Sequence, residues 1–283
     1  MNFLVSKKFD FLWIIGPAFY SSFFVLLLNL LNLAPQSITP LYWLIFVVFI
    51  DVSHVWSTLF RTYLHKERRA EFQKELWVAP ILCYGTGVIL YALGDLIFWR
   101  CLAYLAVFHF IRQQYGIYRI YHFKNKDDSK FWFINALAIY SSTIIPLLLW
   151  HLSGPSSINW FVEGDFFYYE WPELIPFLKI SSLVILLLYI LKEKLLCHNK
   201  LHSTKNYFLI GTLLSWWLGI VWLKNDWAFT LTNVIGHGVP YFALIYLNDL
   251  KQRDKIIWWR TLPTLTIFIF LFAIGFMEEW LWD

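Results

Sequence analysis

The sequence contains little charge. Only 15% of its 283 residues are Asp, Glu, Lys or Arg, whereas 59% are hydrophobic and the mean hydropathy is +0.55. Soluble domains carry about 25% charged residues, so this chain lacks the polar surface that a soluble fold exposes. Its 23 basic and 19 acidic residues give a net charge of +4, which is too small to indicate a polyanionic partner. These shortages exclude a soluble enzyme, a nucleic-acid-binding protein and a disordered chain.

Cysteine is also scarce. The three cysteines, Cys83, Cys101 and Cys197, are an odd number at scattered positions without CxxC spacing. This pattern excludes a disulfide framework and a cysteine-based zinc site. Aromatic residues, in contrast, are abundant: 17 Trp, 16 Tyr and 27 Phe make up 21% of the chain. Such side chains favour membrane–water interfaces, so the composition indicates a polytopic membrane protein surrounded by membrane lipids.

Long apolar runs define the expected helices, since a bilayer-spanning helix needs roughly 20 apolar residues. The sequence contains about nine such runs, at 11–33, 39–60, 76–97, 98–121, 131–152, 174–191, 207–223, 227–247 and 261–280. We therefore predict an all-α fold, a polytopic integral membrane helical bundle with a single transmembrane domain over 1–283. Lysine and arginine gather before the first run and after each even-numbered run. By the positive-inside rule, this arrangement predicts a cytoplasmic N-terminus.

Polar side chains inside three of these runs share helical faces, because steps of three and four residues return to the same side of a helix. They are Asp51, His54, Thr58 and Arg61; His109, Arg112 and Gln113, with Gly116 on the same face; and Asn233, His237 and Tyr241. An ionisable residue in hydrocarbon costs at least about 2.5–3.5 kcal/mol, so each is a functional candidate by default. The alternative is that single histidines, asparagines and threonines only form hydrogen bonds between helices.

The three histidines are predicted at similar depth in the inner half of the membrane, on helices that run in the same direction. Neutral imidazole is a ligand for Zn, Fe and Cu, and three ligands leave coordination positions open. We predict that His54, His109 and His237 hold a transition metal, non-haem iron in the first instance, with zinc or copper as alternatives. Asp51 and Asn233 lie within one turn of a histidine and are expected to orient these ligands.

The remaining polar residues of these faces are expected to bind a substrate or to react with it. Guanidinium stays protonated and cannot ligate a metal, so Arg61, Arg112 and Gln113 are expected to hold a polar or anionic end. Tyr115 and Tyr241 are expected to donate hydrogen bonds or protons. Histidines outside these faces are expected to be solvated in loops (His65, His122, His198 and His202) or at the outer end of a helix (His151).

Two other functions use the same residues. Two histidines on neighbouring helices can hold a haem whose propionates arginine neutralises, which gives an electron-transfer protein. A buried set of Asp, His and Arg can also relay protons or ions in a transporter. The haem interpretation is weakened because no helix carries a pair of histidines, and the transport interpretation because no internal repeat is visible.

The segments Asp51–Tyr63 (DVSHVWSTLFRTY), His109–Gly116 (HFIRQQYG) and His237–Tyr241 (HGVPY) resemble a group of bacterial multi-spanning membrane proteins without an assigned activity. The resemblance covers most of the chain and implies the bacterial inner membrane.

A looser similarity links Phe108-His109-Phe110 and His237-Gly238 to the Brp/Blh carotenoid dioxygenases. That family holds non-haem iron with four intramembrane histidines. Here three are placed in spans, His65 is the remaining candidate, and Pro240-Tyr241 replaces the family's acidic residue. The similarity implies a metal-dependent oxidoreductase acting on a lipid or isoprenoid-type hydrophobic substrate.

Overall fold

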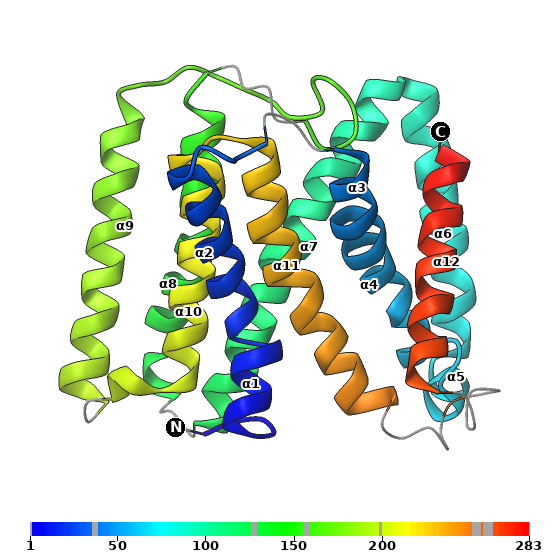
Figure 1. Ribbon diagram of the computed structural model, residues 1–283, viewed down its shortest axis with the longest axis horizontal. Coiled ribbons are helices and arrows are strands. Elements are labelled where there is room, and N and C mark those ends of the chain that lie inside the picture. Colours follow the sequence, from blue (N-terminus) through cyan, green and yellow to red (C-terminus); the bar gives the residue numbers. More distant parts are fainter. Residues whose placement is uncertain are drawn as a thin grey trace. The chain divides into compact units, whose positions relative to one another are not determined.

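The structure is a computed structural model that describes residues 2–35, 39–125, 129–154, 159–197, 200–250, 256 and 263–282. Within these ranges the chain forms helices and no β-strand (Figure 1). The β-type pairing found there consists of two isolated bridges, His65 with Ile256 and Ser153 with Glu170. The prediction of an all-helical fold is confirmed for the described residues.

The α-helices are α1 (Lys7–Trp13), α2 (Gly16–Leu30), α3 (Pro40–Tyr42), α4 (Ser53–Trp56), α5 (Lys66–Glu71), α6 (Gln73–Leu93), α7 (Asp95–Lys124), α8 (Trp132–His151), α9 (Leu174–Leu191), α10 (Thr204–Trp216), α11 (Asp226–Ile245) and α12 (Thr264–Trp282). The π-helical segments are η1 (Trp43–Val52), η4 (Lys192–Leu196), η6 (Trp217–Trp222) and η7 (Tyr246–Leu250). The 3₁₀ segments are η2 (Ser57–Arg61), η3 (Ser129–Phe131) and η5 (Lys200–His202).

Among the described residues, six helical stretches are long and apolar enough to cross a membrane. They are Pro40–Arg61, Gln73–Leu93, Trp132–His151, Leu174–Leu196, Asp226–Asn248 and Thr264–Leu281. The bent pair α1 and α2 makes a seventh if it forms one span. Two of the nine predicted spans, now α7 and α10 with η6, are not in this set, and α7 carries three arginines along its length. The described residues therefore provide six or seven candidate spans, where the sequence predicts nine.

The first predicted span is broken into two helices that meet at 47°. Pro17 lies in the first turn of α2, where proline is tolerated because its missing N–H has no partner in a helix. A Cβ atom on Gly16 would lie 1.9 Å from the carbonyl oxygen of Phe11, so this turn requires glycine. The Gly-Pro pair therefore ends one helix and starts the next.

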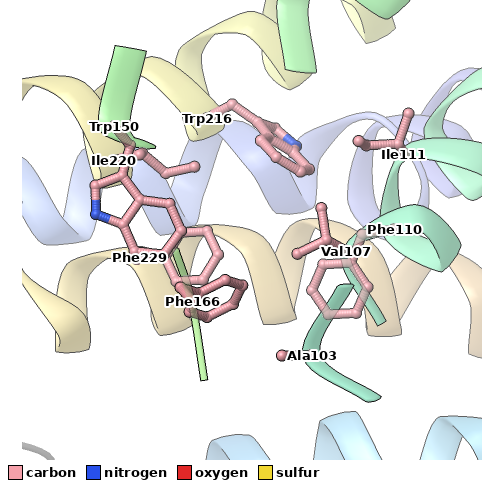
Figure 2. Close-up of a cluster of buried hydrophobic side chains, with 9 residues drawn as sticks. All are labelled: Ala103, Val107, Phe110, Ile111, Trp150, Phe166, Trp216, Ile220 and Phe229. Atoms are coloured by element: carbon pink, nitrogen blue, oxygen red, sulfur yellow. The ribbon is translucent and has the colours of Figure 1, made fainter. Parts of the chain in front are cut away.

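By its internal contacts the chain divides into two compact units. Unit 1 comprises 1–37 and 99–237, and unit 2 comprises 38–98 and 238–283. In unit 1, α2 packs on α10, α10 packs on α8, and α8 packs on α9. The core of unit 1 is rich in aromatic side chains from α7, α8, α10, α11 and the segment before α9 (Figure 2). Its buried members are Ala103, Val107, Phe110, Ile111, Trp150, Phe166, Trp216, Ile220 and Phe229.

Unit 1 also contains a buried ion network at the end of α9. The Glu193 carboxylate accepts a hydrogen bond from Lys205 at 2.7 Å, forms an ion pair with Lys192, and accepts from the Asn206 amide at 3.0 Å. Lys192 donates in turn to Asn135 of α8. All three charged side chains are almost fully buried, and paired burial of this kind is what makes charge tolerable away from water.

In unit 2, η1, α4 and η2 form one continuous helical path, and α12 packs against η1 and α4. Trp56 donates its indole N–H to Glu278 of α12 at 2.6 Å. The hydroxyl of Ser53 donates to the carbonyl of Val48, five residues earlier, at 2.8 Å. The buried apolar residues of this unit are Phe60, Ile245, Leu250, Ile256, Ile267 and Leu271.

Candidate functional site

Two of the predicted ligands lie side by side in unit 1. The rings of His109 on α7 and His237 on α11 are 5.0 Å apart between centroids and nearly perpendicular, at 81°. Phe110 stacks on His237 at 3.9 Å, so one face of this imidazole is covered. His237 is buried, whereas His109 is exposed. A fixed, buried imidazole beside an accessible one is an arrangement that can bind a metal ion from one side.

The two helices that carry this pair are joined by adjacent glutamines. Gln113 donates to the His237 carbonyl at 2.7 Å, and Gln114 donates to the Gly236 carbonyl at 3.3 Å. Pro240 explains the second bond, since proline has no N–H for the carbonyl four residues before it. Gln114 therefore satisfies a backbone group that the helix itself leaves open, and the backbone at His237 is held against α7.

The third predicted ligand belongs to unit 2. His54 is buried in α4, directly after the π-helical segment η1. Its Nδ1 lies 3.3 Å from the Ile50 carbonyl oxygen and 3.5 Å from an Asp51 carboxylate oxygen. Both neighbours are acceptors, which favours the tautomer with hydrogen on Nδ1 and the lone pair on Nε2. The predicted proximity of Asp51 to His54 is thus observed.

Within unit 2 the second half of α11 packs around His54. The ring of Tyr241 lies 5.5 Å from the imidazole, and its hydroxyl forms a 2.9 Å hydrogen bond with Thr58 of η2. A Cβ atom on Gly238 would lie 2.7 Å from Cγ2 of Ile50 and 3.5 Å from Nδ1 of His54. Only glycine permits this separation between α11 and the helix that carries His54.

Arg112 and Tyr115 contact α8. The Arg112 guanidinium donates to the Tyr140 hydroxyl and lies 5.1 Å from the Tyr115 ring centroid. Tyr115 stacks on Tyr140 at 4.8 Å. Arg112, which is predicted to bind a substrate, and Tyr115, which is predicted to donate hydrogen bonds or protons, therefore form one cluster with Tyr140, which the sequence does not single out.

Two other predicted site residues are Asn233 of unit 1 and Arg61 of unit 2. Asn233, expected to orient His237, donates instead to the Phe229 carbonyl at 3.1 Å and to the Thr232 hydroxyl at 3.3 Å. Its Oδ1 is buried and has no hydrogen-bond partner among the described residues. Arg61 ends η2 in unit 2 and is half-buried.

Two histidines expected to be solvated are buried instead. His65 accepts a hydrogen bond from the Arg68 N–H at the start of α5 and pairs with Ile256, which is a capping role, and among the described residues the group of three histidines does not include it. His122 lies within α7, and its Nδ1 is 3.4 Å from the Asn135 amide. Local polarity predicts loops at both positions, but helix ends packed against other segments enclose the rings.

The other two loop histidines differ. His202 is exposed, as expected, and His198 lies outside the described residues. His151 at the end of α8 is held between the Leu147 carbonyl at 2.8 Å and the Tyr104 hydroxyl at 2.7 Å. It therefore has a structural set of partners of its own in unit 1.

Comparison with protein-family models, with curated proteins and with solved structures found no match.

Proposed function

We propose that the protein is a membrane-embedded metalloenzyme of the oxidoreductase type, with a metal ion held by His54, His109 and His237. Each histidine offers one ring nitrogen as a ligand atom. The observation that carries this proposal is the pair of His109 and His237, whose rings are 5.0 Å apart on helices joined by Gln113 and Gln114. Packing alone explains one histidine, but it does not explain two imidazoles in edge contact on helices that two glutamines join.

The continuity of α11 supports His54 as the third ligand. In unit 2, His54 packs against Gly238, and Gly238 directly follows His237 in an unbroken helix. The hydrogen bond from Nδ1 to the Ile50 carbonyl directs the lone pair to Nε2, as in metal-binding histidines whose other nitrogen donates to a carbonyl or carboxylate.

The donor set also fits a metal chemically. Three neutral imidazoles suit iron, zinc or copper, and a bound iron would supply redox and oxygen chemistry to an adjacent hydrophobic substrate. Non-haem iron is our first choice, and the substrate class is a lipid or isoprenoid-type molecule.

The chain's own residues divide into positioning and binding groups. Asp51 and Gln113 hold the ligands in place, the first beside the His54 ring and the second on the His237 backbone. Gln113 Oε1 is buried without a hydrogen-bond partner among the described residues, so it remains an acceptor for a substrate group. Tyr241 supplies a hydroxyl, and Arg61 and Arg112 supply the positive charge for an acidic end.

We further propose nine spans, which adds α7 and α10 with η6 to the apolar helices, together with a cytoplasmic N-terminus in a bacterial inner membrane. The polarity of α7 is then the property expected of a helix that forms a functional site, since intramembrane ionisable residues mark such sites.

The test is elemental analysis and an absorbance spectrum of protein purified in mild detergent without chelators. We expect near-stoichiometric metal and no Soret band. The variants H54A, H109A and H237A are expected to lose the metal and still be extracted from membranes as folded protein. The matched control is H151A, a histidine with structural partners, which is expected to retain the metal.

Full metal occupancy in all three variants would exclude the proposed ligands. A Soret band would favour the haem protein, and metal-free wild-type protein would favour a proton or ion relay by the same residues.

A further inference from the structure

One face of α7 is exposed along its length and changes character from one end to the other. Side chains spaced by three and four residues share this face. Its exposed members are Leu105, Phe108, His109, Arg112, Arg119, Ile120 and Phe123. The apolar residues Leu105 and Phe108 precede His109, and the two arginines follow it toward the Lys124 end.

The two arginines flank an aromatic pair formed by α7 and α8. Tyr115 and Trp132 are in edge contact at 5.7 Å. Arg112 lies 5.1 Å from Tyr115, and Arg119 lies 5.8 Å from Trp132 and 5.2 Å from Phe123. Aromatic faces hold guanidinium groups in place without neutralising them, so the charge of both arginines remains available.

Neither arginine forms an ion pair with a carboxylate in the part of the chain that the structure describes. Arg112 uses one of its five donors on the Tyr140 hydroxyl, and the remaining donors are free to bind an anion. In a spanning helix, an arginine without a counter-ion raises the free energy of insertion into the bilayer. An anion from the surroundings removes much of this cost, and the anions that a bilayer supplies are lipid headgroups.

We propose that this face of α7 binds the phosphate group of an anionic phospholipid between Arg112 and Arg119, with the lipid's apolar chain along Phe108 and Leu105. Phosphate suits two guanidinium groups, which bind its oxygens through paired hydrogen bonds. The part of the lipid's acyl chain nearest the headgroup then passes His109, which lies one helical turn from Arg112. The inference rests on the proposed function in two respects: it takes α7 as a span, and it names the substrate class of that site, an amphiphile with a phosphate headgroup.

The test is native mass spectrometry of detergent-purified protein titrated with phosphatidylglycerol, with phosphatidylcholine and inorganic phosphate as separate probes. We expect phosphatidylglycerol to bind best. R112Q and R119Q should each weaken it about fivefold, because a basic residue near an anionic membrane surface contributes about 1 kcal/mol. The double variant should lose most of the preference. R112K and R119K, which keep the charge, should retain more binding than the glutamine variants.

The matched control is R100Q on the same helix. Arg100 also lies over an aromatic ring, Phe167, but donates to the Gly164 carbonyl. The R100Q substitution is therefore expected to leave the preference for phosphatidylglycerol unchanged. Equal phosphatidylglycerol binding by wild-type protein and the double glutamine variant would overturn the proposal. Inorganic phosphate that binds as tightly as the lipid would overturn the lipid as the source of the phosphate.

The variant H109A separates this proposal from the metal site. We expect it to lose the metal and to keep the lipid preference, since the arginines hold the headgroup. Lipid preference without metal in the wild-type protein would refute the metalloenzyme alone, and metal without lipid preference would refute the lipid site alone.

Discussion

At the scale of single residues, backbone carbonyls help to fix the polar groups of the site: His54 Nδ1 lies 3.3 Å from the Ile50 carbonyl oxygen, and Gln114 donates to the Gly236 carbonyl. Steps of three and four predict that Asp51 lies beside His54, and the structure has their atoms 3.5 Å apart. The bracing role of Gln114 is missed, because it depends on a carbonyl on another helix. The signal that could have revealed it is Pro240, which leaves the Gly236 carbonyl without its partner within the helix.

The close packing of Gly238 against the helix that carries His54 leads to a prediction. Gly238→Ala places a Cβ atom 2.7 Å from Cγ2 of Ile50 and is expected to destabilise the protein by about 1–3 kcal/mol, the range for overpacking. Thermal unfolding in detergent, followed by circular dichroism, measures the change. We also expect lower metal content, since the added methyl group displaces the helix that carries His54.

The control is Gly116→Ala, another glycine inside a long helix. A Cβ atom there would meet no atom within 4 Å. Alanine is the better helix former by about 0.5–1 kcal/mol, so this variant is expected to be as stable as the wild type or more so. A similar loss of stability in both variants would contradict the steric explanation for Gly238.

At the scale of elements, the lengths of the apolar runs predict where the helices lie. They do not predict where a helix is broken or changes to π-helical geometry. Predicted spans 39–60, 131–152 and 227–247 correspond to Pro40–Arg61, Trp132–His151 and Asp226–Asn248. The break in the first span has a local signal, Gly16-Pro17, whereas the π-helical segments have none. In η1 the wider turn accompanies the Ser53 hydroxyl bonds to Val48 and to Leu271 of α12, the second of which is a tertiary contact that local sequence does not encode.

The hydrogen bond from Gln114 to the Gly236 carbonyl is expected to stabilise α11 where Pro240 removes the bond within the helix. Gln114→Leu leaves the Gly236 carbonyl without a donor and is expected to cost about 1–3 kcal/mol of stability. In a Pro240→Ala background, the restored N–H of residue 240 can bond that carbonyl within the helix, so the same substitution is expected to cost less. A double-mutant cycle on thermal unfolding measures this coupling.

Gln114 also accepts a hydrogen bond from Thr212 at 3.0 Å, so Thr212→Val serves as the control. The loss of stability caused by Thr212→Val is expected to be the same with proline and with alanine at position 240. A Gln114→Leu effect equal in both backgrounds would show that Gln114 acts through Thr212 and not through the carbonyl that proline leaves open.

At the scale of the whole molecule, composition predicts membrane insertion, but the number of spans depends on how α7 is treated. Hydropathy is a poor guide to a helix with arginines on its exposed face and Tyr118, Tyr121 and Gln114 buried on the other. If α7 spans the bilayer, its two ends lie on opposite sides. Apolarity therefore identifies Pro40–Arg61 and Asp226–Asn248, which carry His54 and His237, but not α7, which carries His109.

Single cysteines test this topology after replacement of Cys83, Cys101 and Cys197 by serine. Leu93 and Lys124 are exposed and flank α7. With nine spans, an impermeant maleimide added to intact cells is expected to label Leu93→Cys and to label Lys124→Cys only after permeabilisation. Lys130→Cys and Ser153→Cys, which flank the apolar helix α8, provide the control pair, with Ser153→Cys labelled from outside. Labelling of both α7 ends from the same side would exclude α7 as a span.

The buried network of Glu193 also has a consequence for how the protein is made. Glu193 and Lys192 adjoin each other after α9, but the two other groups that bind the carboxylate, Lys205 and Asn206, follow 12 and 13 residues later. Because the ribosome makes the chain from its N-terminus and its exit tunnel holds the most recently made residues, α9 reaches the translocon while those partners are still inside the ribosome. During that interval the counter-ions closest in the chain to the carboxylate are the two adjoining lysines, Lys192 and Lys194. The arrival of α10 then completes the network, so α9 and α10 become attached as a hairpin after both have been synthesised.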